Sequence, residues 1–372
     1  MATKKERRRA ERSRGSAASP LPGEAPSSRA EGSFELVEVV ETAARRRHPP
    51  DELFPLGLNR LLLGDCLQVM RLLPSESVDL IYADPPFFSR RNHAADDAAE
   101  ARSFSDVWEG GLPAYLAWLA ARLSEMRRLL KPTGGIYVHL DWHASHYVKC
   151  EMDRLFGYES FRNEIFWRRD VAGKGAKRIS GQWPRNADTI LVYSKTEDWF
   201  FEQAYAELTP EQAANYRYRE PDGRRFKTVQ LGDYTEASIK RLEAEGRIYT
   251  SSTGRRYKKY YLDEARATLD TIWTDIPGFG TRTASSERLG YPTQKPEALL
   301  ERIIKASSPK DGVVADFFCG SGTACAVAQK LGRRWLGCDI SPAAIELASA
   351  RLRRLLAPLL PDPGFTTERF RG

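Results

Sequence analysis

VVADFFCGSGTACAVAQKLGRRWLGCD, residues 313–339, is the stretch that decides the fold. It opens with an apolar strand candidate, Val313–Phe318, which runs into a glycine turn and an amphipathic helix. A second short strand, Arg334–Cys338, follows and ends in Asp339. A strand, a helix and a second strand in this order predict a β-α-β unit, the building block of a parallel sheet. The sequence therefore predicts an α/β fold.

The same rhythm continues over the chain from about residue 51, where short apolar runs alternate with helical segments. Such alternation is typical of a mostly parallel sheet with helices on both faces. The pattern predicts seven strands, of which the other five are Leu58–Leu63, Val78–Ala83, Gly135–Leu140, Asn163–Arg168 and Thr189–Tyr193. Apolar stripes at helical spacing predict core helices over Leu116–Leu130, Leu299–Ile304 and Ile345–Leu355.

Composition bounds the class of protein. Apolar residues make up 41% of the 372, enough for a full core, and the net charge of +7 suits a polyanionic partner. Neither a long apolar run nor a signal-like segment occurs, so we expect a soluble, cytoplasmic protein without a membrane partner. The five cysteines lack ligand spacing, and the histidines from His139 to His146 are interpreted as structural. We therefore expect free thiols and no metal site.

Two segments interrupt the rhythm. Residues 1–50 begin with many Lys and Arg and continue with Ser, Ala, Pro and Gly, a composition that predicts a disordered basic tail. Residues 200–288 are rich in Tyr, Arg, Lys and Gly and are interpreted as an insertion outside the sheet. The insertion therefore divides one sheet domain into two halves, residues 51–199 and 289–372.

The tetrapeptide Asp84-Pro85-Pro86-Phe87 directly follows the strand Val78–Ala83. It lies at the carboxyl end of a strand, where open α/β sheets bind ligands. The prolines make the loop rigid, so the Asp84 carboxylate and the Pro85 carbonyl can be aimed at an amino group, while Phe87 offers a face for a base. The alternative is a simple turn followed by a core phenylalanine.

The glycine turn FCGSGT, residues 318–323, forms a second candidate site. Its glycines let a ligand approach the backbone, and the helix that follows presents free N–H groups. Asp339 ends the next strand, where an acidic residue can accept hydrogen bonds from the ribose of an adenosyl cofactor. These features fit S-adenosylmethionine and a nicotinamide dinucleotide equally, so the turn alone leaves the cofactor open.

The two motifs together resemble the catalytic and cofactor motifs of β-class DNA amino-methyltransferases, which modify N6 of adenine or N4 of cytosine. YPTQKP, residues 291–296, resembles the segment before their first helix. In that class the catalytic motif comes first, a target-recognition region follows and the cofactor motif comes last, as in this sequence. The resemblance spans about residues 56–354 and implies a circularly permuted Rossmann-like methyltransferase fold. Its catalytic half would be residues 51–199, its target-recognition insertion 200–288 and its S-adenosylmethionine-binding half 289–372.

The resemblance also implies roles for single residues. Asp84, Pro85, Pro86 and Phe87 would hold the amino group of a flipped-out base for direct methyl transfer. The residues implied to bind S-adenosylmethionine are Asp65, Lys295, Asp316, Phe318, Gly320, Ser321, Gly322, Thr323 and Asp339. Asp65 would contact the cofactor's adenine, and Lys295 would pair with the methionine carboxylate or serve as an exposed helix-cap lysine.

The implied substrate is double-stranded DNA. An Asp before Pro-Pro resembles the adenine enzymes, so we expect N6-adenine methylation; the alternatives are an N4-cytosine DNA methyltransferase and an RNA or protein amino-methyltransferase. Basic clusters among tyrosines predict that Arg255, Arg256, Lys258 and Lys259 bind DNA, with a solvated surface loop as the alternative. A homodimer, since dimers are common in this class, and a cognate restriction endonuclease are further candidate partners.

Overall fold

The computed structural model describes residues 32–40, 50–89, 92–93, 104–170, 181, 183–279, 287–356 and 364–372. In this part of the chain the main sheet has ten strands in the order β1-β18-β2-β17-β16-β3-β6-β8-β7-β15. The seven predicted strands are all present. Their bounds are β2 Asn59–Leu63, β3 Val78–Ala83, β6 Leu130–Leu140, β7 Phe161–Arg168, β8 Ala187–Ser194, β16 Val313–Asp316 and β17 Arg334–Asp339.

The centre of the sheet is parallel from β2 through β17, β16 and β3 to β6, and β8 then runs antiparallel to β6 and β7. Strands β16 and β3 come from distant parts of the chain, yet they pair directly, with Val314 opposite Leu80. From this pair the chain moves outward through β17 in one direction and through β6 in the other. The carboxyl ends of β16 and β3 therefore flank the point where the strand order reverses, which is where open sheets bind ligands.

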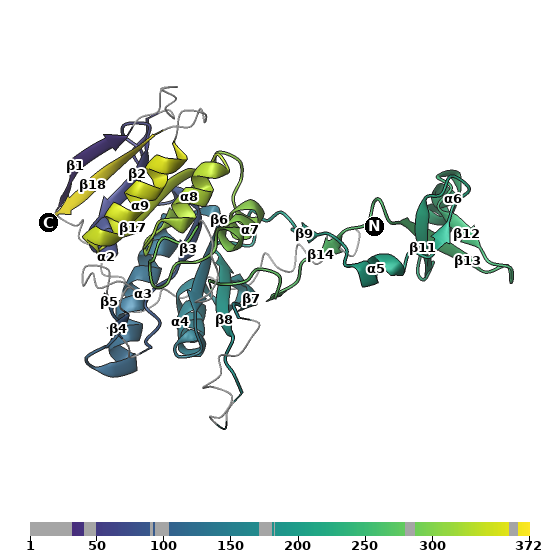
Figure 1. Cartoon of the computed structure of the whole chain (residues 1–372), viewed down its shortest axis with the longest axis horizontal. Helices are drawn as coiled ribbons and strands as arrows, with labels where there is room; N and C mark the ends of the chain where they lie inside the picture. The colour runs from purple at the N-terminus through teal and green to yellow at the C-terminus, as the bar shows by residue number, and fades with distance from the viewer. Residues whose placement is uncertain are drawn as a thin grey trace, which may run out of the picture.

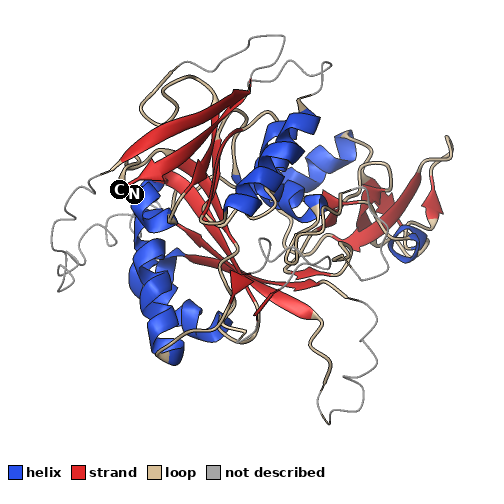
Figure 2. Ribbon diagram, turned by 60° about the vertical axis from the view of Figure 1, so that its left-hand side comes forward, coloured by secondary structure: helices blue, strands red, loops and turns tan. Residues whose placement is uncertain are grey.

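Helices cover both faces of the sheet (Figure 2). On one face lie α2 Cys66–Arg71, α3 Gly111–Leu129 and α4 Ser145–Phe156, and on the other α7 Glu297–Ser307, α8 Thr323–Lys330 and α9 Pro342–Leu355. Alternate residues of a strand point to opposite faces. In β3, Ile81 packs with the first group, whereas Leu80 and Tyr82 pack with the second. Because the strand is buried on both faces, it is apolar except for Asp79, which is why the sequence predicted it with its observed bounds.

Two further strands extend one edge of the sheet. β1 Ser33–Val40 pairs antiparallel with β18 Phe365–Arg371, and β18 pairs in parallel with β2. The prediction of a disordered tail is wrong for residues 33–40, because the ladder to β18 gives this segment hydrogen-bond partners that its composition does not reveal. Residues 1–31 and 41–49 of the predicted tail lie outside the described residues.

The inserted residues form a separate small sheet, joined to the main one by a narrow connection (Figure 1). Its strand order is β10-β11-β13-β12. The elements of this part are β9 Tyr205–Ala206, α5 Pro210–Ala214, β10 Tyr218–Arg219, β11 Arg225–Gln230, α6 Glu236–Ala244, β12 Ile248–Thr250, β13 Arg256–Tyr261 and β14 Ala267–Thr268. β9 pairs with β14 at its base, and β15 Ile272–Trp273 is already back in the main sheet beside β7. The main sheet therefore resumes before residue 288, the predicted end of the insertion.

Three short elements complete the described chain. β4 Asn92–His93 pairs with β5 Phe104–Ser105 as a two-stranded ladder, and the 3₁₀ helix η2 Tyr158–Ser160 connects α4 to β7. None of the described helices is long and apolar enough to cross a membrane.

Candidate active site

A cavity of about 330 Å³ opens at the reversal point of the sheet. Both predicted motifs line it, although they lie far apart in the sequence. The loop after β3 contributes Asp84, Pro85, Pro86 and Phe87, and the end of β16 with the glycine turn contributes Asp316, Phe318, Gly320, Ser321 and Thr323. Asp65, Lys295 and Asp339 complete the predicted residues on its wall. The volume falls within the range of small-molecule sites.

The loop after β3 is held by contacts with two other parts of the chain. The carbonyl of Pro86 accepts a hydrogen bond of 2.8 Å from Tyr115 Oη. In addition, the fully buried carboxylate of Asp106 accepts hydrogen bonds from the backbone N–H groups of Phe88 and Ser89, at 3.0 and 2.6 Å. Phe88 has a φ of 60°, which a non-glycine residue adopts only when its surroundings enforce it. These contacts therefore hold the loop, and with it the backbone of Asp84, in one conformation.

Asp84 presents two different oxygens. Oδ2 accepts a hydrogen bond from Nζ of Lys295, which lies 211 residues away in the sequence. Oδ1 is buried and has no hydrogen-bond partner among the described residues. A buried acceptor without a partner is costly, so it marks a position that a ligand donor can fill. Asp84 therefore carries an unfilled acceptor in the cavity wall.

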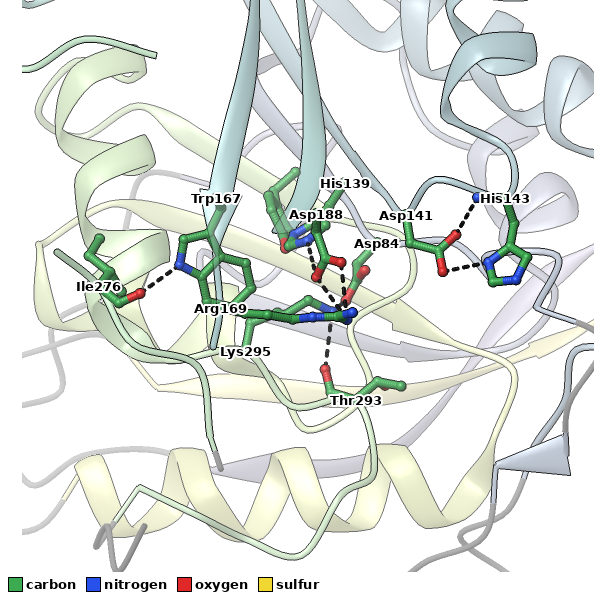
Figure 3. A network of polar contacts seen from close by, with 11 residues as sticks. Asp84, His139, Asp141, His143, Trp167, Arg169, Asp188, Ile276, Thr293 and Lys295 are labelled. Atoms are coloured by element: carbon green, nitrogen blue, oxygen red, sulfur yellow. Dashed lines mark hydrogen bonds and ion pairs between the residues drawn. The ribbon is translucent and has the colours of Figure 1, made fainter. Parts of the chain in front are cut away.

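Lys295 departs from one of its two predicted roles, and its pairing with the cofactor's carboxylate stays a prediction. Its side chain is 9% exposed, so it is not an exposed cap of α7. Its ammonium group bonds to Asp84 and, at 3.2 Å, to the carbonyl of Thr293 (Figure 3). The prediction of a pairing with the cofactor's carboxylate did not anticipate this partner, because nothing in the sequence places residue 295 beside residue 84.

The glycine turn is shaped by two close approaches. Gly320 has a φ of 48°, and a Cβ there would lie 2.9 Å from the ring of Tyr291. Gly322 has a φ of 70°, and a Cβ there would lie 2.8 Å from Cβ of Ala348 on α9. Only glycine meets both requirements. Gly320 lines the cavity, whereas Gly322 packs against α9 and is not among the lining residues, and its predicted cofactor contact stays a prediction.

Two further carboxylates stand beside the turn. Asp339 accepts hydrogen bonds of 2.9 Å from the N–H groups of Gly320 and Ser341, and Asp316 accepts one of 3.0 Å from Phe318. Burial raises the pKa of Asp339 and raises that of Asp316 well above its ordinary range; the negative charges of Asp84 and Asp339 raise the latter further. Burial and mutual repulsion thus disfavour the charged forms of these carboxyls, and a bound cation would relieve that repulsion.

A polar network surrounds His139, and Figure 3 shows its members His139, Asp188 and Arg169. The Phe87 ring stacks on the imidazole of His139, with ring centroids 6.0 Å apart. His139 Nδ1 lies 2.8 Å from Tyr82 Oη, and Nε2 lies 3.4 Å from the buried carboxylate of Asp188. Asp188 in turn pairs with Arg169 at 3.0 Å. His139 is thus a hydrogen-bonded structural histidine, and its network fixes the plane on which Phe87 rests.

A family model described as DNA methylase matches residues 78–350 of the chain. This chain belongs to the DNA methylase family. Enzymes of this family use S-adenosylmethionine as the methyl donor. The wall of the methylase fits such a cationic adenosyl group, because it combines clustered carboxylates, a backbone turn open to close approach and the unfilled acceptor of Asp84.

Three curated relatives of the methylase are each 29% identical to it. The type II methyltransferase M.EcaI of Enterobacter cloacae aligns over 82% of this chain and 69% of its own length. The DNA adenine methyltransferase YhdJ of Escherichia coli aligns over 78% and 82%. The StyLTI Mod subunit, of a type III restriction-modification enzyme from Salmonella typhimurium, aligns over 71% and 49%, so the chain spans about half of that relative.

Solved structures similar to the methylase include the DNA modification methylase TTHA0409 of Thermus thermophilus, complexed with S-adenosyl-L-methionine. That match covers 84% of this chain and 98% of the other, with 20% identity and a TM-score of 0.47. The cytosine-N4-specific PvuII DNA methyltransferase matches over 84% and 90%, with 16% identity and a TM-score of 0.46.

One wall of the methylase cavity was not predicted. Trp118 and Arg122 of α3 line it, with the guanidinium 3.9 Å from the centroid of the Trp118 ring. Arg122 also pairs at 2.5 Å with Asp65, whose other oxygen caps α2 through the N–H groups of Leu67 and Gln68. The carboxylate of Asp65 is therefore already engaged, which the sequence did not indicate. The spacing of four between Trp118 and Arg122, off the apolar stripe of α3, was the available signal.

The predicted DNA-binding residues do not form one patch. Arg255 is exposed in the turn before β13, whereas Arg256 pairs with Glu243 of α6. Lys258 and Lys259 are neighbours on β13, so they point to opposite faces of the small sheet. Lys258 donates to Tyr234 Oη at 3.0 Å, and Lys259 pairs at 2.6 Å with Glu220, whose pKa it lowers. Much of the positive charge is therefore balanced within the insertion.

Of the five cysteines, four are buried and Cys150 is exposed. Burial raises the pKa of the Cys66 thiol to about 12 and that of Cys319 well above its ordinary value, as expected for packing residues. Within the described ranges, no group of three or more His, Cys, Asp or Glu side chains could hold a metal ion.

Proposed function

We propose that this DNA methyltransferase modifies N6 of adenine in double-stranded DNA, with the target base turned out of the helix into the cavity. The observation that carries the proposal is the position of Asp84: the residue lines the same cavity as the glycine turn, and its buried Oδ1 has no partner among the described residues. An amino group conjugated to a purine is a weak nucleophile, and its N–H groups need acceptors. Asp84 can provide one of them.

The proposed mechanism is positioning with electrostatic support. S-adenosylmethionine would supply a methyl group on a positively charged sulfur, held by the glycine turn, Asp316 and Asp339. Oδ1 of Asp84 accepts one N–H of the target amine and the Pro85 carbonyl accepts the other, so that the nitrogen lone pair is freed from the ring. The rigid loop holds both acceptors in place before the substrate arrives, which is where such a site gains its rate enhancement.

Base flipping is part of the proposal because a stacked base cannot reach a cavity behind the loop after β3. Extrusion costs a few kcal/mol, and stacking on Phe87 returns about 1–3 kcal/mol of it. The network around His139 keeps the Phe87 ring in a fixed plane. Phe87 is therefore proposed as the platform for the flipped base.

Adenine is preferred over cytosine because Asp84 stands before the two prolines, and the relative YhdJ is named a DNA adenine methyltransferase. The proposal extends to target recognition by the insertion, with Arg255 as one of its exposed basic residues. A homodimer and a cognate endonuclease are proposed partners, in line with the restriction-modification name of the StyLTI relative. The enzyme would act in the compartment that holds the DNA.

The test is methylation of plasmid DNA by the purified protein with labelled S-adenosylmethionine, followed by digestion to nucleosides and mass spectrometry. N6-methyl-2′-deoxyadenosine is the expected product, and N4-methyl-2′-deoxycytidine would reject the base assignment while keeping the chemistry. The variant Asp84→Ala should lose all transfer yet bind S-adenosylmethionine in isothermal titration. Retained turnover by Asp84→Ala would reject the mechanism. Long-read sequencing of DNA from cells expressing the protein would give the target site.

A further inference from the structure

The ion pair between Lys295 and Asp84 lies at the centre of the cavity wall. Both side chains are largely buried, with 9% and 14% of their surfaces exposed. The ammonium group also bonds to the carbonyl of Thr293 at 3.2 Å and lies 5.3 Å from the centroid of Phe87. Lys295 therefore contacts the catalytic loop from a segment that belongs to the cofactor half of the chain.

We propose that Lys295 is a positioning residue, which holds Oδ2 of Asp84 and so keeps Oδ1 turned into the cavity to accept the amine N–H. This inference rests on the proposed function. A carboxylate has two equivalent oxygens and rotates about a single bond, so a donor on one oxygen determines where the other points. Two observed features agree with this role: Oδ2 is bonded, and Oδ1 has no partner within the described chain.

Lys295 also balances the charge of the site. Its positive charge opposes the rise in the pKa of buried Asp316, and it contributes to the lowered pKa of Asp188. Without it, Asp84 would face the carboxylates of Asp316 and Asp339 with no cation bonded to it. Repulsion would then favour a rotation of the Asp84 side chain away from the glycine turn.

The alternative role is a salt bridge to the methionine carboxylate of the cofactor. A lysine in that role lowers the dissociation constant of the cofactor and leaves the chemical step intact. A lysine that orients Asp84 raises the rate at saturating cofactor and leaves cofactor affinity nearly unchanged. The two roles therefore separate in binding and turnover measurements.

The experiment compares Lys295→Met, which keeps the length of the side chain, with the wild-type protein. Lys305→Ala is the control, because Lys305 is an exposed lysine of α7 paired with Glu301 and not with the cavity. We expect Lys295→Met to lower kcat about 100-fold, the usual loss when a positioned donor is removed, and to change the Kd for S-adenosylmethionine less than about twofold. A Kd raised about tenfold or more with nearly normal kcat overturns the proposal.

Chemical rescue distinguishes a hydrogen bond from charge alone. In Lys295→Ala, added ethylammonium should restore part of kcat, whereas tetramethylammonium, which has the charge but no N–H, should not. Equal rescue by the two ions would mean that Asp84 needs only a nearby cation, and the positioning role would be wrong. If the alanine variant does not fold, Lys295→Gln tests the same distinction without added amine, because it retains an N–H donor and lacks the charge: it should keep more of kcat than Lys295→Met, and equal losses would contradict the positioning role.

A structural readout is independent of turnover. A crystal structure of Lys295→Met without cofactor should show the Asp84 carboxylate rotated relative to the wild type, and an unchanged orientation would contradict the inference. If the wild-type protein transferred no methyl group to DNA, the proposed function would fail, and this comparison of side-chain orientation would still judge the role of Lys295.

Discussion

Tyr82 Oη lies 2.8 Å from His139 Nδ1, and this contact fixes the ring on which Phe87 stacks. Tyr82 and His139 lie near the ends of neighbouring parallel strands, β3 and β6, so the support under Phe87 is built from the sheet itself. The side chain of Phe87, although it lies in a loop, is therefore held in place by residues of the sheet core. Phe87 is therefore available as a fixed surface before any base enters.

Replacing Phe87 with alanine should remove the stacking surface. We expect Phe87→Ala to weaken binding of a duplex with an extruded 2-aminopurine at the target position by roughly 1–3 kcal/mol. Phe87→Tyr keeps the face and should stay within about 0.5 kcal/mol of the wild type. Fluorescence titration measures both, and equal affinities for the alanine and wild-type proteins would show that the base does not stack there.

Asp316 should make stability depend on pH. Burial raises its pKa above the ordinary value of 3.8. Below pH 3.8 the carboxyl is protonated in the folded and the unfolded protein, so no difference arises; at higher pH the unfolded chain loses its proton first, and folding becomes less favourable until the folded-state pKa is passed. We expect Asp316→Asn to raise the Tm of the ligand-free protein near neutral pH and to change it little near pH 4.

Asp275 serves as the control, because its pKa is shifted in the opposite direction from that of Asp316. Its hydrogen bond to Arg302 lowers its pKa, so its contribution favours folding at neutral pH and is lost on acidification. Asp275→Asn should therefore lower the Tm slightly at neutral pH. If thermal unfolding showed Asp316→Asn to be destabilising at every pH, the account of buried negative charge would have to be abandoned.

The edge of the sheet depends on a buried ion pair. Arg60 of β2 donates from Nε to Glu368 Oε1 of β18 at 2.9 Å, and both side chains are almost fully covered. Glu368→Ala leaves the guanidinium without its counter-charge, so the free energy of unfolding should fall by about 3–5 kcal/mol in urea titrations. The exposed pair of Arg371 with Glu35 is the control, and Glu35→Ala should cost no more than about 1 kcal/mol. Similar losses of unfolding free energy in the two variants would show that the buried pair contributes no more than the exposed one.

Arg255 of the insertion provides a test of DNA contact. The other predicted DNA-binding residues, Arg256, Lys258 and Lys259, are bonded to side chains of the insertion itself. Arg255→Glu should weaken binding to duplex DNA and reduce the slope of log K against log salt by about 1, because one phosphate contact is lost. Lys305→Glu, on α7, should leave the slope unchanged. Filter-binding or anisotropy titrations at several salt concentrations give the slopes, and an unaltered slope for Arg255→Glu would remove this turn from the interface.

Most of the strands that the sequence predicted are buried on both faces and read as largely apolar runs, as VDLIYA of β3 does. β7 is the exception: it alternates, with Ile165 and Trp167 buried between exposed or half-buried neighbours. β1 and β18 could not be recognised in this way. Every residue of β1 is exposed or half-buried on the outer edge, and β18 buries Thr366 and Glu368, whose polar groups are satisfied only by partners on β2 or beside them. β15 has two residues, too few for any periodicity.

In the candidate site, too, local features could be predicted and contacts between distant residues could not. Asp84 and the glycine turn were found because strand, turn and spacing are local features, and the structure brings both to one cavity. The pairing of Lys295 with Asp84 was missed because it joins residues 211 apart. The internal pairs of Arg256 and Lys259 were missed for the same reason: charge in a sequence does not show which carboxylate neutralises it.

The two-stranded ladder of β9 and β14 has a consequence for how such an enzyme can change. Ala206 lies opposite Ala267, so the chain leaves and re-enters at almost the same place. Because the two ends of the inserted segment lie side by side, the main sheet places little constraint on the length or shape of the chain between β9 and β14. The small sheet could therefore be replaced by another inserted segment, while the chemistry at the reversal point of the main sheet stays the same.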